Sequence, residues 1–238
     1  MSTAQDLHDS PLRRPGSPPG RPGGAAHQPE KPVLRGVFHE VAAAGALSAW
    51  VLLVAAAPSG PGRLAAAVYG ATLFALFATS ALYHRPNWSP RARMVMRRLD
   101  HSAIFLLIAG SYTPFCLVLG GSAGRTLLWV AWTGAALGVL QSVFWVRAPK
   151  LLVSAIYLLL GWVVLPVVPA LLRVLGPGAV ALLAAGGLAY SLGAVVYATR
   201  RPDPIPRVLG YHEVFHALVV LAAALQFTVV AEAVRAIR

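Results

Sequence analysis

The residues best suited to chemistry are four of the seven histidines, which lie at the ends of long apolar segments. They are His84, His101, His212 and His216. His212 and His216 are four residues apart, so on a helix their imidazoles share one face. Ser80 and His84 have the same spacing. Two imidazoles on one face of an apolar helix are costly to bury without a ligand, and this favours a metal site.

Three imidazoles and an open position suit a catalytic zinc ion, which takes three protein ligands and one water. We therefore predict that His84, His212 and His216 bind zinc. Zinc lowers the pKa of its water toward about 7, which makes hydroxide available at neutral pH. We expect Asp100 to orient that water or accept its proton, and Ser80 to hydrogen-bond the water or a developing oxyanion.

Each of these residues also has a simpler interpretation. A single histidine at a helix end, such as His84, is often an interfacial residue. Asp100 could favour the positive N-terminus of its helix, and the Ser80 hydroxyl could bond a carbonyl of its own helix. His101 follows Asp100 directly and points about 100° away from it on a helix, so we expect a packing or hydrogen-bonding role.

The segment His212-Glu213-x-x-His216 also matches the H-E-x-x-H motif, in which the glutamate is the general base of a metalloprotease. Because the motif opens an apolar segment, this alternative would be an intramembrane protease. The best third ligand, however, is His84 on another segment, with Ser80 one turn before it. This arrangement favours a different hydrolase.

The composition predicts an integral membrane protein. Of 238 residues, 57% are apolar and 12% are charged, about half the charge of an average soluble chain, roughly 25%. Soluble domains, collagens, coiled coils and disulfide scaffolds are excluded. The net charge of +12 would suit nucleic acid, but the basic residues lie in short clusters between apolar segments. We therefore expect no nucleic-acid partner.

The chain contains seven apolar segments, each long enough to cross a bilayer as a helix. They are continuous rather than alternating and rich in alanine and leucine, so strands are excluded. We predict an all-α bundle of seven transmembrane helices within one domain, residues 33–238. Residues 1–32, rich in proline, glycine and arginine, are predicted to form a disordered cytoplasmic tail. The predicted spans are 38–57, 64–84, 100–119, 126–146, 151–173, 179–198 and 212–233.

The distribution of lysine and arginine predicts the orientation. The N-terminal tail and every second connection hold fifteen of these residues, and the opposite side holds five. The positive-inside rule then places the N-terminus inside and the C-terminus outside, as expected for a multi-pass protein of the cell (plasma) membrane. Arginine outnumbers lysine 18 to 2, which is typical of a GC-rich bacterial genome. This topology places the residues of the predicted zinc site at one depth, the cytoplasmic edge of the membrane.

Three blocks of the sequence resemble the signature blocks of the haemolysin III family. They are SALYHR (80–85), LDHSAIFLLIAGSYTPF (99–115) and YHEVFHALVVLAAALQF (211–227). The family belongs to a superfamily with the progestin and adiponectin receptors and the alkaline ceramidases. The resemblance covers roughly residues 33–235.

The resemblance implies a seven-helix membrane fold with its N-terminus inside and zinc near the cytoplasmic face. The family's metal positions match His84, His212 and His216, and Ser80 and Asp100 match the residues beside the metal water. Many relatives carry another histidine where this chain has Gln226, over two turns beyond His216, so we expect little effect of that difference on zinc.

The superfamily implies hydrolysis of lipid amides, and our first hypothesis is a zinc hydrolase acting on a membrane lipid amide or ester. Such a substrate would reach the site laterally from the bilayer. A second hypothesis is a non-enzymatic receptor or sensor with a structural zinc. A third is a cytolysin, as the family name suggests, although no polar stripe runs through successive segments as a conducting path requires. The substrate, the ion bound and the oligomeric state stay open.

Overall fold

The computed structural model describes residues 32–205 and 207–237. Within these ranges the chain is helical, and its sole strand-like feature is an isolated bridge between Ile205 and Leu209. The predicted tail lies outside the described residues apart from Pro32. The helices are α1 (Val37–Ala56), α2 (Pro61–His84), α3 (Pro90–Leu119), α4 (Gly121–Phe144), α5 (Lys150–Gly161), the short 3-10 helix η1 (Leu165–Val167), α6 (Val168–Thr199) and α7 (Tyr211–Ala236).

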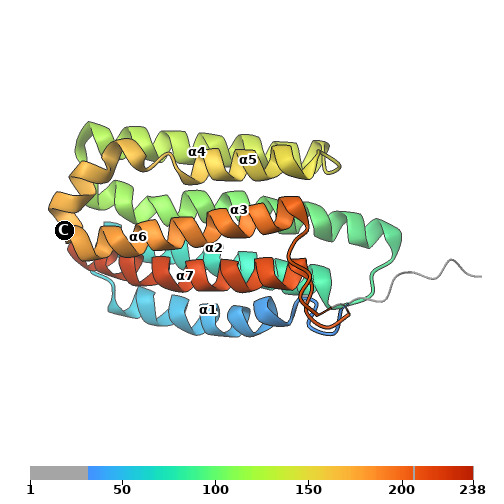
Figure 1. Ribbon diagram of the computed structural model, residues 1–238. Helices are drawn as coiled ribbons and strands as arrows, with labels where there is room; N and C mark the ends of the chain where they lie inside the picture. The colour runs from blue at the N-terminus through green and yellow to red at the C-terminus, as the bar shows by residue number, and fades with distance from the viewer. Residues whose placement is uncertain (1–31, 206, 238) are drawn as a thin grey trace, which may run out of the picture. The chain divides into compact units, whose positions relative to one another are not determined.

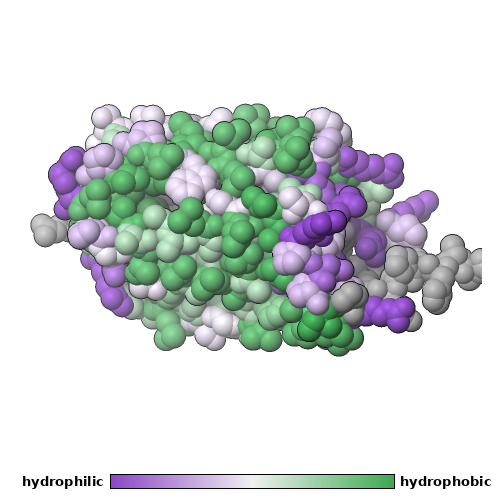
Figure 2. Space-filling model, viewed as in Figure 1, coloured by the Kyte–Doolittle hydropathy of each residue, from purple (hydrophilic) through white to green (hydrophobic). Residues whose placement is uncertain are grey.

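Six helical segments of the described chain are long and apolar enough to cross a membrane. The described part of the chain is therefore helical, and the protein is a multi-pass integral membrane protein. In Figure 2, apolar side chains cover the middle of the visible face, and hydrophilic side chains gather toward the two ends. This banding is expected when the middle of a helix faces hydrocarbon and its ends face water.

The fifth of these six segments, Lys150–Thr199, contains α5, η1 and α6. The sequence predicted two separate spans here. At Gly176 the backbone leaves the helical conformation, with φ 82° and ψ 169°, a region that glycine enters without steric cost. Pro177 follows and has no N–H to donate back into the preceding turn. The chain reverses its direction within this segment in Figure 1.

Helix α7 is central to the packing. It contacts α1, α2, α3 and α6, and α1 and α4 lie on opposite sides of this group (Figure 1). Close approach of α2 and α3 depends on Gly110, because a Cβ there would overlap the Thr72 side chain. Small residues at such contacts are a common way for helices to associate in membranes.

Three helix ends meet where α2 finishes. Helix α1 begins beside the end of α2, since a Cβ on Gly36 would lie 2.9 Å from the His84 Cβ. Gly36 has a φ of 80°, which favours glycine and lets the chain turn into α1 at this point. Helix α7 begins at the same end, and its His212 contacts His84. The first turns of α1 and α7 and the last turn of α2 therefore lie close together.

Helix α3 is longer than its predicted span, which began at residue 100. It begins at Pro90, where the Ser89 hydroxyl accepts a hydrogen bond from the Ala92 N–H as an N-cap. The first nine residues of α3 contain four arginines. For this reason they were not included in the apolar segment predicted from the sequence. Asp100 therefore lies well inside the helix, which removes its simpler interpretation as a residue at the helix N-terminus.

Candidate metal centre

His84, His212 and His216 lie together at the junction of α2 and α7. Each offers a ring nitrogen, and the three nitrogens are within 4.8 Å of one another. The Nε2 atoms of His84 and His212 are 3.1 Å apart. The ring centroids are 4.5 to 5.0 Å apart. The structure thus brings together the three histidines that the sequence singled out.

This donor set fits a metal ion. Tetrahedral zinc with Zn–N bonds of about 2.0–2.1 Å holds its ligand nitrogens about 3.3 Å apart, close to the 3.1 Å between His84 and His212. The Nδ1 atom of His216 is buried without a hydrogen-bond partner. Among the described residues no fourth histidine, cysteine or carboxylate joins the cluster. The three histidines could therefore hold an ion and leave a coordination position open.

Ser80 and Asp100 are both buried beside this cluster. The Ser80 side chain lies beside the Asp100 carboxyl. Ser80 lies one turn before His84 on α2, and Asp100 comes from α3. All three side chains line the same cavity, so the hydroxyl and the carboxyl face the space that the histidines face.

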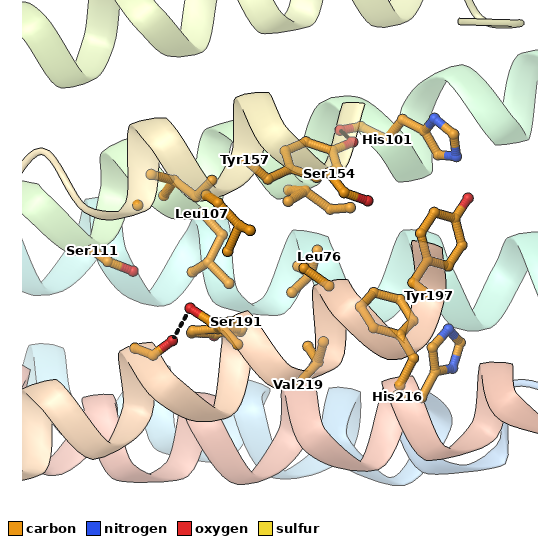
Figure 3. A pocket seen from close by; sticks show the side chains of 18 of the residues that line it. Leu76, His101, Leu107, Ser111, Ser154, Tyr157, Ser191, Tyr197, His216 and Val219 are labelled. Carbon is orange, nitrogen blue, oxygen red and sulfur yellow. Dashed lines mark hydrogen bonds between the residues drawn. The ribbon is translucent and has the colours of Figure 1, made fainter. Parts of the chain in front are cut away.

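His101 lies outside the cluster of three histidines. It lines the cavity, and its backbone carbonyl accepts a hydrogen bond from the Tyr157 hydroxyl at 3.3 Å. In Figure 3 its ring is at the same end of the cavity as His216, on the opposite wall. His101 therefore serves as a control residue in mutagenesis of the cluster, because it lines the same cavity but does not belong to the three-histidine cluster.

Glu213 does not face the cavity, although it belongs to the H-E-x-x-H match. Its side chain is completely buried, and Oε1 forms an ion pair with the Arg35 Nε at 2.6 Å. Its Oε2 accepts a hydrogen bond from the Gly210 N–H at 2.9 Å. Oε1 thus joins the residues just before α1 to α7, and Oε2 caps the N-terminus of α7 itself. With both oxygens engaged in this way, a role as the metalloprotease base is disfavoured.

His39 is a neighbour of the cluster that the sequence did not reveal. Its ring stacks on His216 with centroids 3.8 Å apart and an interplanar angle of 5°. It also meets the Phe77 ring edge-to-face at 5.1 Å. His39 is buried, and within the described chain neither of its nitrogens has a hydrogen-bond partner. One feature of the sequence could have pointed to His39. It lies at the start of the first apolar segment, on the same predicted side of the membrane as His84 and His212.

The cluster opens into a cavity of about 540 Å³ among α2, α3, α5, α6 and α7. Its walls change along its length, as Figure 3 shows. One end contains His216, His101 and Tyr197. Leu107 and Val219 face the middle, and Ser111 and Ser191 lie toward the other end. Small-molecule sites commonly have volumes of about 300–1,000 Å³ and mostly apolar walls. The cavity thus joins a polar end, which includes the three histidines, to an apolar interior.

Comparison with known proteins identifies the family. The family described as Haemolysin-III related matches residues 27–227 of this chain. The chain belongs to the haemolysin III family. It is 32% identical over 199 residues to Hemolysin-3 of Bacillus cereus, which covers 82% of this chain and 88% of that protein. It is 34% identical over 161 residues to a Hemolysin-3 homolog of Bacillus subtilis (strain 168), covering 67% of this chain and 72% of the relative.

A more distant relative comes from an animal. The human protein named Monocyte to macrophage differentiation factor is 28% identical over 171 residues, covering 69% of this chain and 68% of its own length. The resemblance read from the three sequence blocks is therefore confirmed at the level of the family.

Proposed function

We propose that this haemolysin III family protein is a zinc-dependent hydrolase that cleaves a membrane lipid amide or ester. The observation that supports it is the convergence of three imidazole nitrogens at the polar end of a largely apolar cavity. An acyl chain fits the apolar interior, and the bond to be cleaved then lies near the histidines.

The number of protein ligands in the cluster supports a catalytic ion over a structural one. Structural zinc sites are closed by four protein ligands, whereas catalytic sites keep one position for water or substrate. Three histidines form the cluster within the described chain, and all three line the cavity. The sensor hypothesis, with a structural zinc, would need a fourth protein ligand in that cluster.

The chain's own residues would divide the remaining work. When bound, the zinc ion supplies Lewis-acid activation of a water and of the carbonyl to be cleaved. The Asp100 carboxylate accepts the proton that the attacking water loses and later delivers it to the leaving group. The Ser80 hydroxyl, beside Asp100, donates a hydrogen bond to oxygen that becomes negatively charged during attack.

We propose the following topology for this site. Residues 33–238 would form one domain with seven spans, two of them from the long segment Lys150–Thr199, which is kinked at Gly176 and turns back on itself in Figure 1. The excess of lysine and arginine on one side supports a cytoplasmic N-terminus, an outside C-terminus and a site at the cytoplasmic edge of the plasma membrane.

The printed name of the Bacillus cereus relative supports a second candidate function, membrane lysis. Release of a trapped dye from vesicles on adding the purified protein would support lysis. If the protein is instead a hydrolase, the vesicles should retain their dye while their lipid is cleaved.

The hydrolase proposal is tested with purified full-length protein by measuring metal content and cleavage of a fluorescent ceramide. We expect about one zinc per chain and turnover in the unaltered protein. His84→Ala leaves only two imidazoles in the cluster, so this variant should lose both the zinc and the turnover. His101→Ala is the matched control and should keep its zinc. Full lipid amidase activity in the folded His84→Ala variant would contradict the proposal.

A further inference from the structure

Three cationic side chains line the cavity at its polar end. Arg93 and Arg97 come from the first turns of α3, and Lys150 is the first residue of α5. Arg97 interacts electrostatically with both Asp100 and His101, and Lys150 also interacts with His101. The three cations therefore share the cavity lining with the residues of the candidate metal centre.

Within the described residues, none of these three cations has a carboxylate oxygen within 4.0 Å. Within the described residues, the ion pairs closer than 4.0 Å are Arg35 with Glu213 and Arg85 with Glu40. The other basic residue on the cavity wall, Arg35, is therefore neutralised. Asp100 is the sole carboxylate among the residues that line the cavity. The polar end of the cavity thus has an excess of positive charge, which attracts anions.

Aromatic rings hold two of these cations in place. The Lys150 Nζ lies 4.3 Å from the centre of the Tyr197 ring and donates a hydrogen bond of 3.4 Å to the Tyr211 hydroxyl. The Arg93 guanidinium lies 5.8 Å from the centre of the Tyr83 ring. Cation–π contacts of this kind fix a side chain and leave its N–H groups free for a ligand.

We propose that Arg93, Arg97 and Lys150 bind the phosphate of an anionic lipid whose acyl chain occupies the cavity. Guanidinium groups present paired N–H donors that match phosphate oxygens, and an ammonium group adds a further charge. The apolar walls beyond suit a hydrocarbon chain. The assignment of this lipid as the substrate rests on the proposed function, whereas its binding does not.

A simpler reading is that these arginines only orient the protein in its membrane. Arg91 distinguishes the orienting role from the binding role. It lies on the same first turns of α3 but is exposed and does not line the cavity. Replacing Arg91 removes one charge from the same membrane face as replacing Arg97 does. An orienting role makes the two replacements equivalent, and a binding role does not.

The test measures binding to the full-length protein in detergent, with three probes. Dioctanoyl phosphatidic acid carries both the phosphate and the chains, dioctanoylglycerol carries the chains alone, and inorganic phosphate carries the charge alone. We expect the phosphatidic acid to bind at least tenfold more tightly than either of the others. Arg97→Gln and Lys150→Gln should each weaken that binding about tenfold, and Arg91→Gln by less than twofold.

Equal affinity for the phosphatidic acid and dioctanoylglycerol would overturn the proposal, as would equal weakening by Arg91→Gln and Arg97→Gln. Inorganic phosphate binding as tightly as the phosphatidic acid would also overturn it, because the chains would then contribute nothing. Retained binding in a protein that cleaves no lipid would refute the proposed function and leave this inference standing.

Discussion

At the scale of single residues, the candidate centre is a set of polar side chains buried where hydrocarbon would otherwise surround them. An unpaired polar group in such a place costs several kcal/mol, roughly 2–7, so its presence needs a compensating partner. The Nδ1 of His216 and both ring nitrogens of His39 have no hydrogen-bond partner among the described protein groups. A bound ion would compensate part of this cost.

The stacked pair of His39 and His216 leads to a prediction about metal affinity. His39→Ala should weaken zinc binding about tenfold, because the His216 ring loses the face that orients it. His39→Phe keeps a flat ring against His216 and should stay within threefold of the unaltered protein. Competition with a chromogenic chelator measures both affinities. Unchanged affinity in His39→Ala would show that the stacking does not support the centre.

Asp100 leads to a prediction about turnover. Asp100→Asn preserves the shape of the side chain but removes the proton acceptor, so we expect lipid cleavage to fall about 10²–10⁴-fold. Zinc content should be unchanged, because Asp100 lies outside the three-histidine cluster. The assay is turnover per bound zinc. Loss of zinc together with turnover would instead make Asp100 a ligand.

At the scale of helices, the start of α1 is joined to the start of α7 by one buried ion pair. Glu213 is completely buried, and Arg35 is mostly buried. Removing one partner of such a pair leaves a buried charge unpaired, which costs about 3–5 kcal/mol in fully buried cases. The pair therefore has a structural role near the centre, and Glu213 need not take part in the reaction.

Glu213→Gln separates these roles. We expect a lower melting temperature, because Arg35 loses its counter-charge, while the turnover of the folded fraction stays within about threefold. Thermal unfolding in detergent and turnover per folded molecule are the two measurements. A variant of normal stability that had lost its turnover would restore the H-E-x-x-H interpretation, in which Glu213 is the base.

Parts of this arrangement could be predicted from the sequence and others could not. The apolar segments, and the shared helix face of His212 and His216, could be predicted from local periodicity. The common depth of His84 and the two α7 histidines could be predicted from the membrane face that each helix end reaches. The contact of His39 with His216 depends on how α1 packs against α7, which no local pattern encodes. The early start of α3 was missed because its first turns are arginine-rich and resemble a connection between spans.

At the scale of the whole molecule, the proposed topology predicts which sites are accessible from each side of the membrane. The single cysteine, Cys116, is buried, and Cys116→Ser gives a background for labelling. A cysteine at Asn87 should react with an impermeant maleimide only after the cells are opened. A cysteine at Ser122, exposed at the start of α4, should react in intact cells. The reverse pattern would contradict the orientation and place the centre at the outer face.

The central claim is that three imidazoles bind one zinc ion and leave a position open. X-ray absorption at the zinc edge of the purified, zinc-loaded protein measures this directly. We predict three imidazole nitrogens and one oxygen at about 2.0–2.1 Å from the zinc, with one imidazole fewer in His216→Ala. A first shell containing sulfur, or a spectrum that His216→Ala leaves unchanged, would contradict it.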